Sequence, residues 1–447
     1  MATLCSLARV RQAGVILLFV AVGMASANAT TKEKVIATFD ITDGMVPQAG
    51  FISDAAGNLY GTTSLGGNAV CADYGGGAGC GTVIELSHSK VGWTETVLYS
   101  FQGDGDGISP SGNLVFDGKG NLYGTTEVGG PGNCLNGCGT VFELSPPAEK
   151  GGEWTETILY SFKGGDDGHL PEAGLIFDGS GNLYGTTFWG GGSNCGGYGC
   201  GTAFELSPPA EPGSPWTETI LHHFPGGTSL DASGPSCTLV PDQSGNLYGT
   251  TGFGGQLSNG AVFELTPPIK AGGAWTESVI YSFTGVDGDG SSPHAGVTFG
   301  PDGALYGTTS GAGASIGGTV FRLAPPAEQG GTWTETVIYS FTLQADGGNP
   351  FGGLIFDTKG NLYGTTLVGG DYSCNEGFND GCGVVFKVVP PKVEGEKWEE
   401  TALHGFAGGS DGMEPSGQLI LGKAGLLYGM TESGGTSNAG IVFSVVP

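Results

Sequence analysis

A Leu-Tyr-Gly sequence recurs seven times along this chain, at intervals of roughly sixty residues. A repeat of this length constrains the fold strongly, because each unit must stack on its neighbours to bury its apolar faces. The copies follow one another from about residue 33 onward without a linker, which predicts one repeat domain. Their tyrosines are Tyr60, Tyr123, Tyr184, Tyr248, Tyr306, Tyr363 and Tyr428.

Each repeat contains four short apolar segments, which in the second unit span residues 112–117, 121–126, 140–144 and 154–162. The segments are rich in β-branched and aromatic residues and are bounded by Gly, Pro, Asp or Asn, which is typical of strands and their turns. No helical periodicity competes with this pattern. The sequence therefore predicts an all-β protein.

Seven units of four strands predict a seven-bladed β-propeller, in which each sheet packs both faces against its neighbours. A β-solenoid is the alternative, although its coils are usually much shorter than about sixty residues. Residues 34–39 match the fourth segment of a unit with no first three before them, whereas the last unit, 417–446, lacks a fourth segment. We expect the N-terminal strand to complete the last blade and close the ring.

The formal net charge of −28 argues against a nucleic-acid partner, which requires a basic surface, and against binding to anionic membranes. Arg9 and Arg11 precede an apolar run at residues 13–25, and small residues follow it. This pattern predicts a signal peptide over residues 1–29, with an uncleaved N-terminal anchor as the alternative. We expect a single domain over residues 30–447, secreted, periplasmic or on the cell surface, monomeric and not inserted in a membrane after cleavage.

The repeat unit resembles a known family. It carries P-E-A-G-L-I-F-D-G-S-G-N-L-Y-G-T-T at residues 171–187, G-T-A-F-E-L at 201–206 and W-T-E-T-I-L-H-H-F at 216–224. This motif is similar to the GloVer tandem repeat of secreted bacterial "choice-of-anchor" proteins and, more distantly, to NHL-type propeller repeats. The resemblance implies an extracytoplasmic propeller but no established activity or catalytic residues. The chain does not match the C-terminal anchor of many relatives, which leaves surface attachment open.

Eight cysteines form close pairs between the second and third segments of their units. The spacing predicts disulfides in an oxidising compartment, which would brace long loops, with a zinc site as the alternative. Cys237 has no nearby partner in the sequence, so it is either a buried free thiol or part of an intermolecular disulfide. The predicted pairs are Cys71 with Cys80, Cys134 with Cys138, Cys195 with Cys200, and Cys374 with Cys382.

An aspartate occurs in the loop before each unit's first segment. One hypothesis is a ring of carboxylates at the channel mouth that binds a cation such as Ca²⁺. The alternative is an Asx turn, in which each carboxylate accepts hydrogen bonds from nearby backbone N–H groups. The residues are Asp43, Asp106, Asp167, Asp231, Asp289, Asp346 and Asp411.

Aromatic residues in the long loops are candidates for ligand binding, because exposed rings can stack on sugars. The alternative is that each ring packs under its own loop. We therefore expect a binding or scaffold module for a glycan or another extracellular component, such as a protein. The other function considered is a propeller lyase or glycosidase using His169 or His294 at the channel mouth, although no catalytic set is apparent. The loop aromatics are Tyr74, Trp189, Tyr198, Tyr372 and Phe378.

Overall fold

The computed structural model describes residues 33–71, 77–103, 105–149, 151–192, 194–211, 213–226, 231–270, 272–328, 330–370, 374, 381–393 and 395–447. The chain divides into two compact units, Met1–Thr30 and Thr31–Pro447, and the described residues all belong to the second. The predicted signal peptide, residues 1–29, lies outside them. In the described part of the chain, no helix has the length and apolar character needed to cross a membrane.

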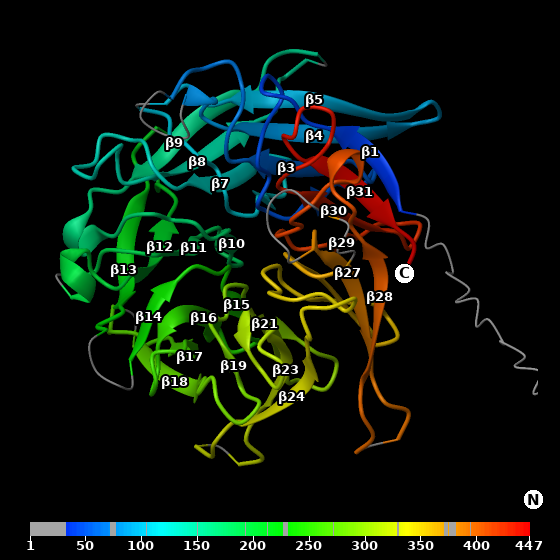
Figure 1. Cartoon of the computed structure of the whole chain (residues 1–447). Coiled ribbons are helices and arrows are strands. Elements are labelled where there is room, and N and C mark those ends of the chain that lie inside the picture. The colour runs from blue at the N-terminus through cyan, green and yellow to red at the C-terminus, as the bar shows by residue number, and fades with distance from the viewer. Residues whose placement is uncertain are drawn as a thin grey trace, which may run out of the picture. The chain divides into compact units, whose positions relative to one another are not determined.

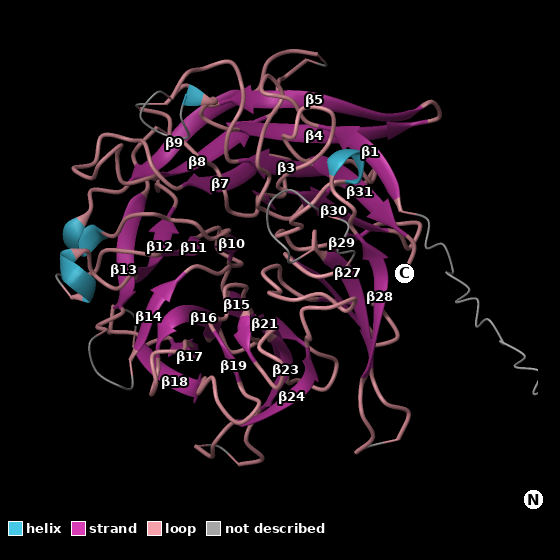
Figure 2. Cartoon of the chain, viewed as in Figure 1, coloured by secondary structure: helices cyan, strands magenta, loops and turns pink. Residues whose placement is uncertain are grey.

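The second unit is a ring of seven antiparallel sheets, which confirms the predicted seven-bladed β-propeller (Figure 1, Figure 2). In each blade the first strand lies nearest the centre of the ring and the fourth lies outermost, as β10 to β13 show in Figure 1. The described loops contain short 3-10 helices at η2 (Gly165–Asp167), η3 (Cys195–Gly197) and η4 (Gly409–Asp411).

The strands of the first three blades follow chain order. The first blade contains β2 (Ile52–Ser53), β3 (Leu59–Thr63), β4 (Thr82–Ser89) and β5 (Gly92–Ser100). The second contains β6 (Val115–Phe116), β7 (Leu122–Thr126), β8 (Thr140–Ser145) and β9 (Thr155–Ser161). The third contains β10 (Ile176–Phe177), β11 (Leu183–Thr187), β12 (Thr202–Ser207) and β13 (Thr217–His223). The inner strands are shorter than the predicted segments.

The remaining blades repeat this order, with additions in the loops. The fourth contains β15 (Val240–Pro241), β16 (Leu247–Gly254), β17 (Ala261–Thr266) and β18 (Thr276–Ser282), and β14 (Ala232–Pro235) also pairs with β16. The fifth contains β20 (Thr298–Phe299), β21 (Leu305–Thr309), β23 (Thr319–Ala324) and β24 (Thr334–Ser340), beside a loop pair of β19 (Gly290–Ser291) and β22 (Gly311–Ala312). The sixth contains β25 (Ile355–Phe356), β26 (Leu362–Thr366), β27 (Val384–Val389) and β28 (Glu399–Gly405).

The seventh blade joins the two ends of the repeat domain. It contains β29 (Ile420–Leu421), β30 (Leu427–Thr431), β31 (Ile441–Val445) and, as its outer strand, β1 (Lys34–Thr38). The antiparallel register of β1 and β31 runs from Lys34 opposite Ser444 to Thr38 opposite Ile441. The predicted closure of the ring by the N-terminal strand is therefore confirmed.

The repeated motif is explained by packing within and between blades. In the second blade Leu122 and Phe142 are fully buried. A Cβ on Gly124 would lie 2.6 Å from the Phe142 ring, so this position has no room for a side chain. The next residue, Thr125, donates a hydrogen bond to the carbonyl of Ala173 in the adjacent blade at 2.9 Å. The Gly-Thr sequence thus supports both core packing and the contact between blades.

Candidate functional site

Two sets of loops meet on one face of the ring: the connections from fourth to first strands and those from second to third strands. Backbone bridges join them, with Ile108 opposite Val128 and Met413 opposite Ser433. We call this face of the ring the loop face.

Four disulfides brace the loop face, and they are the four predicted pairs, Cys71–Cys80, Cys134–Cys138, Cys195–Cys200 and Cys374–Cys382. Their sulfurs lie against glycines of the neighbouring loop. A Cβ on Gly164, for example, would be 2.8 Å from the sulfur of Cys134. The predicted disulfides are therefore confirmed, and they indicate an oxidising environment. Cys237 is free and buried.

Four aromatic side chains gather on the loop face where the third blade meets the fourth. We call Phe188, Trp189, Tyr198 and Phe253 the aromatic patch. Ring centroids are 4.7 Å apart for Phe188 and Trp189, 6.0 Å for Trp189 and Tyr198, and 6.1 Å for Phe188 and Phe253. Tyr198 exposes 65% of its surface and Phe253 exposes 50%. Tyr198 and Phe253 are therefore open to solvent, whereas Phe188 and Trp189 are half-buried.

The local sequence explains how the patch is held. Tyr198 lies inside the short loop closed by the Cys195–Cys200 disulfide, so its backbone is restrained. Trp189 lies in the same connection between β11 and β12, and it forms a backbone bridge with His169 of the connection between β9 and β10. Phe253 stands at the position of Trp189 in the next unit. Sequence analysis missed it, although aromatic residues at one position of two successive units were a usable signal.

Two of the five predicted loop aromatics, Trp189 and Tyr198, therefore lie in the patch. The other three, Tyr74, Tyr372 and Phe378, lie outside the described residues.

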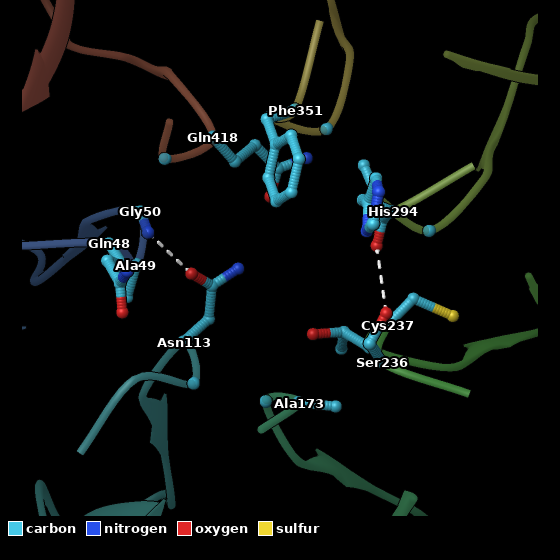
Figure 3. Close-up of a pocket in the computed structure, with 18 of the residues that line it drawn as sticks. Gln48, Ala49, Gly50, Asn113, Ala173, Ser236, Cys237, His294, Phe351 and Gln418 are labelled. Atoms are coloured by element: carbon cyan, nitrogen blue, oxygen red, sulfur yellow. Dashed lines mark hydrogen bonds between the residues drawn. The ribbon is translucent and has the colours of Figure 1, made fainter. Parts of the chain in front are cut away.

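A pocket of about 470 Å³ opens at the centre of the ring (Figure 3). Much of its wall comes from one repeated position, the residue after the proline that precedes each inner strand. This position differs from unit to unit, although the rest of the motif is nearly constant. Scaffold packing therefore does not dictate its identity. The seven residues are Gln48, Ser111, Glu172, Ser236, His294, Phe351 and Ser416.

Hydrogen bonds between neighbouring turns fix the wall of the pocket. The backbone N–H of Gly50 donates to Oδ1 of Asn113 at 2.6 Å, a bond drawn in Figure 3. Ser236 donates to the carbonyl oxygen of His294 at 3.5 Å, also drawn there. The imidazole of His294 stacks on the ring of Phe351.

The pocket is acidic. Burial and the neighbouring charge of Glu127 raise the pKa of Glu172 to about 8. Burial also raises the pKa of Glu432, against a hydrogen bond with Gln48 that favours the ionised carboxylate. Burial lowers the pKa of His294, which keeps its imidazole neutral. Among the described residues that line the pocket there is no Lys or Arg, so it suits a neutral or cationic ligand.

The seven predicted aspartates do not line this pocket. They lie at the boundaries between blades, beside the outer strands, and several accept hydrogen bonds from their own loops. Asp106 accepts from the Tyr99 hydroxyl and from the backbone N–H of Gln102, both at 2.9 Å. Asp346 is bonded in the same way by Tyr339 and Thr342.

A glutamate of the next blade's outer strand lies near the aspartate at most of these boundaries. Glu156 is the example beside Asp106, and burial, with repulsion from Asp106, raises the pKa of Glu156 to about 7. The corresponding glutamates are Glu33, Glu95, Glu218, Glu277, Glu335 and Glu400. These pairs were not predicted, because each joins residues of two different sheets that are distant in sequence, such as Asp106 and Glu156.

Of the two histidines considered for catalysis, His294 lies in the pocket and His169 does not. His169 is placed beside Trp189 by backbone hydrogen bonds at 3.0 and 3.1 Å, and burial lowers its pKa. The structure therefore separates His169 from the pocket wall and associates it with the aromatic patch.

Comparison with known proteins identifies a family and several structures of similar fold. The family model of the Gloeobacter/Verrucomicrobia repeat matches residues 21–211, 133–377 and 272–447. A comparison with curated proteins found no match.

Three solved structures illustrate the similarity in fold. A candidate 6-phosphogluconolactonase of Bacteroides fragilis is 16% identical, with 83% of this chain and 86% of that one covered and a TM-score of 0.45. A protein of Lactobacillus plantarum is 14% identical, with 80% and 84% covered and a TM-score of 0.46. A gluconolactonase of Xanthomonas campestris is 12% identical, with 76% and 87% covered and a TM-score of 0.39. Similarity at this level carries no information about a ligand.

Proposed function

The chain belongs to the Gloeobacter/Verrucomicrobia repeat family, and we propose that it is an exported carbohydrate-binding module that holds a glycan on its aromatic patch. The predicted signal peptide and the four disulfides support export. The observation that carries the binding proposal is the pair formed by the exposed Tyr198 and the half-buried Trp189, whose rings lie 6.0 Å apart at an angle of 44°.

The geometry of the aromatic patch and the rigidity of its backbone favour stacking on a sugar. An aromatic ring pairs an apolar plane with a polar edge, and the apolar face of a sugar ring stacks on such a plane. A ring held in place loses little conformational entropy on binding. Tyr198 is restrained by the Cys195–Cys200 disulfide and Trp189 by its bridge to His169. The patch is thus a preorganised surface.

The test is a glycan array followed by calorimetry with the best oligosaccharide. We expect Trp189→Ala and Tyr198→Ala each to weaken binding about tenfold, since an aromatic contact contributes roughly 0.5–1.5 kcal/mol beyond the apolar area that it buries. Tyr198→Phe keeps the ring and should retain most of the affinity.

The matched control is Phe351→Ala, which removes an exposed aromatic ring from the central pocket rather than from the patch. It should leave affinity unchanged. If Phe351→Ala loses binding and Trp189→Ala binds normally, the glycan binds in the central pocket and not on the aromatic patch. An array on which no glycan binds would contradict the proposal.

A second function is favoured by the carboxyl pair in the pocket. A raised pKa lets Glu172 hold a proton near neutral pH beside the carboxyl of Glu127, an arrangement suited to general acid–base chemistry on a glycosidic bond. In this case the protein is a propeller glycosidase or lyase, with His294 on the pocket wall. Glu172→Gln should then abolish turnover of a glycan that the wild type cleaves, without lowering the melting temperature.

A further inference from the structure

The boundary between the sixth and seventh blades differs from the others in its side chains. Glu33 precedes the N-terminal strand β1, His404 lies on β28, and Asp411 lies in the loop that follows β28. One potential ligand atom from each residue lies within 4.8 Å of the other two, and no other group of three that could hold a metal ion is found in the described chain.

Two polar atoms of this cluster, Oε1 of Glu33 and Nε2 of His404, are buried without a hydrogen-bond partner. Nε2 lies 3.2 Å from Oδ2 of Asp411, which makes an ion pair only when the imidazole is protonated. Oδ2 of Asp411 accepts from the backbone N–H of Ala407 at 2.8 Å. Buried polar atoms are rarely left unpaired, so both atoms are available to a ligand.

Histidine replaces tyrosine at this strand position in two outer strands, as His404 here and as His222 in the third blade. Four other outer strands carry a tyrosine there, and the tyrosine hydroxyl donates to the loop aspartate, as Tyr160 does to Asp167 at 2.5 Å. A phenol donates a hydrogen bond to the aspartate, whereas a neutral imidazole has one N–H and one nitrogen lone pair, which can bind a metal ion. At this boundary a nitrogen ligand therefore stands in place of the tyrosine hydroxyl.

We propose that Glu33, His404 and Asp411 form a binding site for a divalent transition metal, of which Zn²⁺ is the best match. One imidazole nitrogen and two carboxylate oxygens suit Zn²⁺, with water at the fourth position. Ca²⁺ prefers six or more oxygen ligands, which this cluster does not supply. Ligand distances of about 2.0–2.2 Å require separations of about 3.3 Å, which matches the His404–Asp411 spacing. The ligand atom of Glu33 lies within 4.8 Å of the other two and must move closer to reach this spacing.

The site would connect the N-terminal strand to the sixth blade. Glu33 directly precedes β1, the outer strand of the seventh blade, while His404 and Asp411 come from the sixth blade and the loop after it. A bound ion therefore holds β1 against a blade with which it shares no sheet. Metal binding stabilises the closed ring, because the ligands come together only in the folded state.

The first experiment is calorimetric titration of the untagged protein with Zn²⁺ alone. We expect one ion per chain and a melting temperature several degrees higher at saturation. Amide exchange over residues 34–38 should slow when Zn²⁺ is present. Replacing His404 by the tyrosine of the other blades, His404→Tyr, should weaken binding at least tenfold and leave the melting temperature of the metal-free protein unchanged. Glu33→Gln is a second variant with the same expected loss.

The chain provides a matched control in His222, which occupies the same strand position at the boundary of the third and fourth blades. His222 lies 3.3 Å from Glu277, but no third ligand atom completes that set in the described residues. His222→Tyr should bind Zn²⁺ like the wild type. Equal binding by His404→Tyr and the wild type, or a wild type that binds no Zn²⁺, would overturn the proposal.

Discussion

The imidazole of His294 lies flat against the phenyl ring of Phe351, with ring centroids 4.1 Å apart and 16° between the ring planes. The two residues occupy the same motif position in successive units, so the ring geometry brings them together across a blade boundary. Their contact forms one side of the central pocket (Figure 3).

This contact predicts how His294 titrates. Burial lowers its pKa from the ordinary value of 6.5, and Phe351 covers one face of the imidazole. Phe351→Ala admits water to that face, so the pKa of His294 should rise toward 6.5. Histidine chemical shifts followed against pH, with His294→Gln to assign the signal, measure the change. An unaltered pKa in Phe351→Ala would show that other groups bury the imidazole.

Closure of the ring predicts that β1 is as important to stability as any other outer strand. Phe39 follows β1, is fully buried and packs with Phe51 and Ile84 of the first blade. Phe283 holds the same position after β18 and is equally buried. Phe39→Ala and Phe283→Ala should each lower the free energy of unfolding by about 3–5 kcal/mol. Urea denaturation measures both, and a loss below about 1 kcal/mol for Phe39→Ala alone would contradict the closure.

Most of the fold was predictable because its determinants are local and repeated. Apolar segments bounded by turn residues identify strands, and seven copies identify the ring. The disulfides were predictable for the same reason, since Cys195 and Cys200 are close in sequence and lie in one loop.

The candidate sites were less predictable because they join residues from different units. The sequence places Asp106 in the loop from the outer strand of one blade to the inner strand of the next. It does not show whether the side chain lies near the outer strand or near the centre of the ring. The pairing of Asp106 with Glu156, and of Glu33 with His404, depends on how adjacent blades pack.

The glutamates at the blade boundaries predict a dependence of stability on pH. Burial, together with nearby carboxylates, raises the pKa of Glu156 to about 7 and those of Glu95 and Glu400 to about 8, from an ordinary 4.5. Between pH 4.5 and about pH 8, the folded protein therefore binds more protons than the unfolded chain. The free energy of unfolding therefore falls as pH rises from about 4.5 to about 8. Thermal melts should show a higher melting temperature at pH 5 than at pH 8.

One substitution isolates this effect. Glu156→Gln cannot ionise, so it should stabilise the protein at pH 8 by up to about 1 kcal/mol, after discounting for partial exposure, and have little effect at pH 5. Glu153→Gln alters an exposed glutamate of the same blade and should change stability equally little at both pH values. A Glu156→Gln variant with no gain at pH 8 would show that solvent already screens this carboxylate.

The burial of the free cysteine predicts that its thiol does not react in the native protein. Cys237 is 3% exposed, its sulfur accepts the backbone N–H of Thr250 at 3.1 Å, and burial raises the pKa of its thiol. A thiolate is the reactive form, so both access and ionisation are reduced. In protein lacking residues 1–29, a maleimide should label no thiol in the native state and one per chain after unfolding without reductant. The four disulfides account for the other eight cysteines. Rapid labelling of the native protein, or a disulfide-linked dimer on a non-reducing gel, would place Cys237 at the surface and contradict the packing described for the pocket wall.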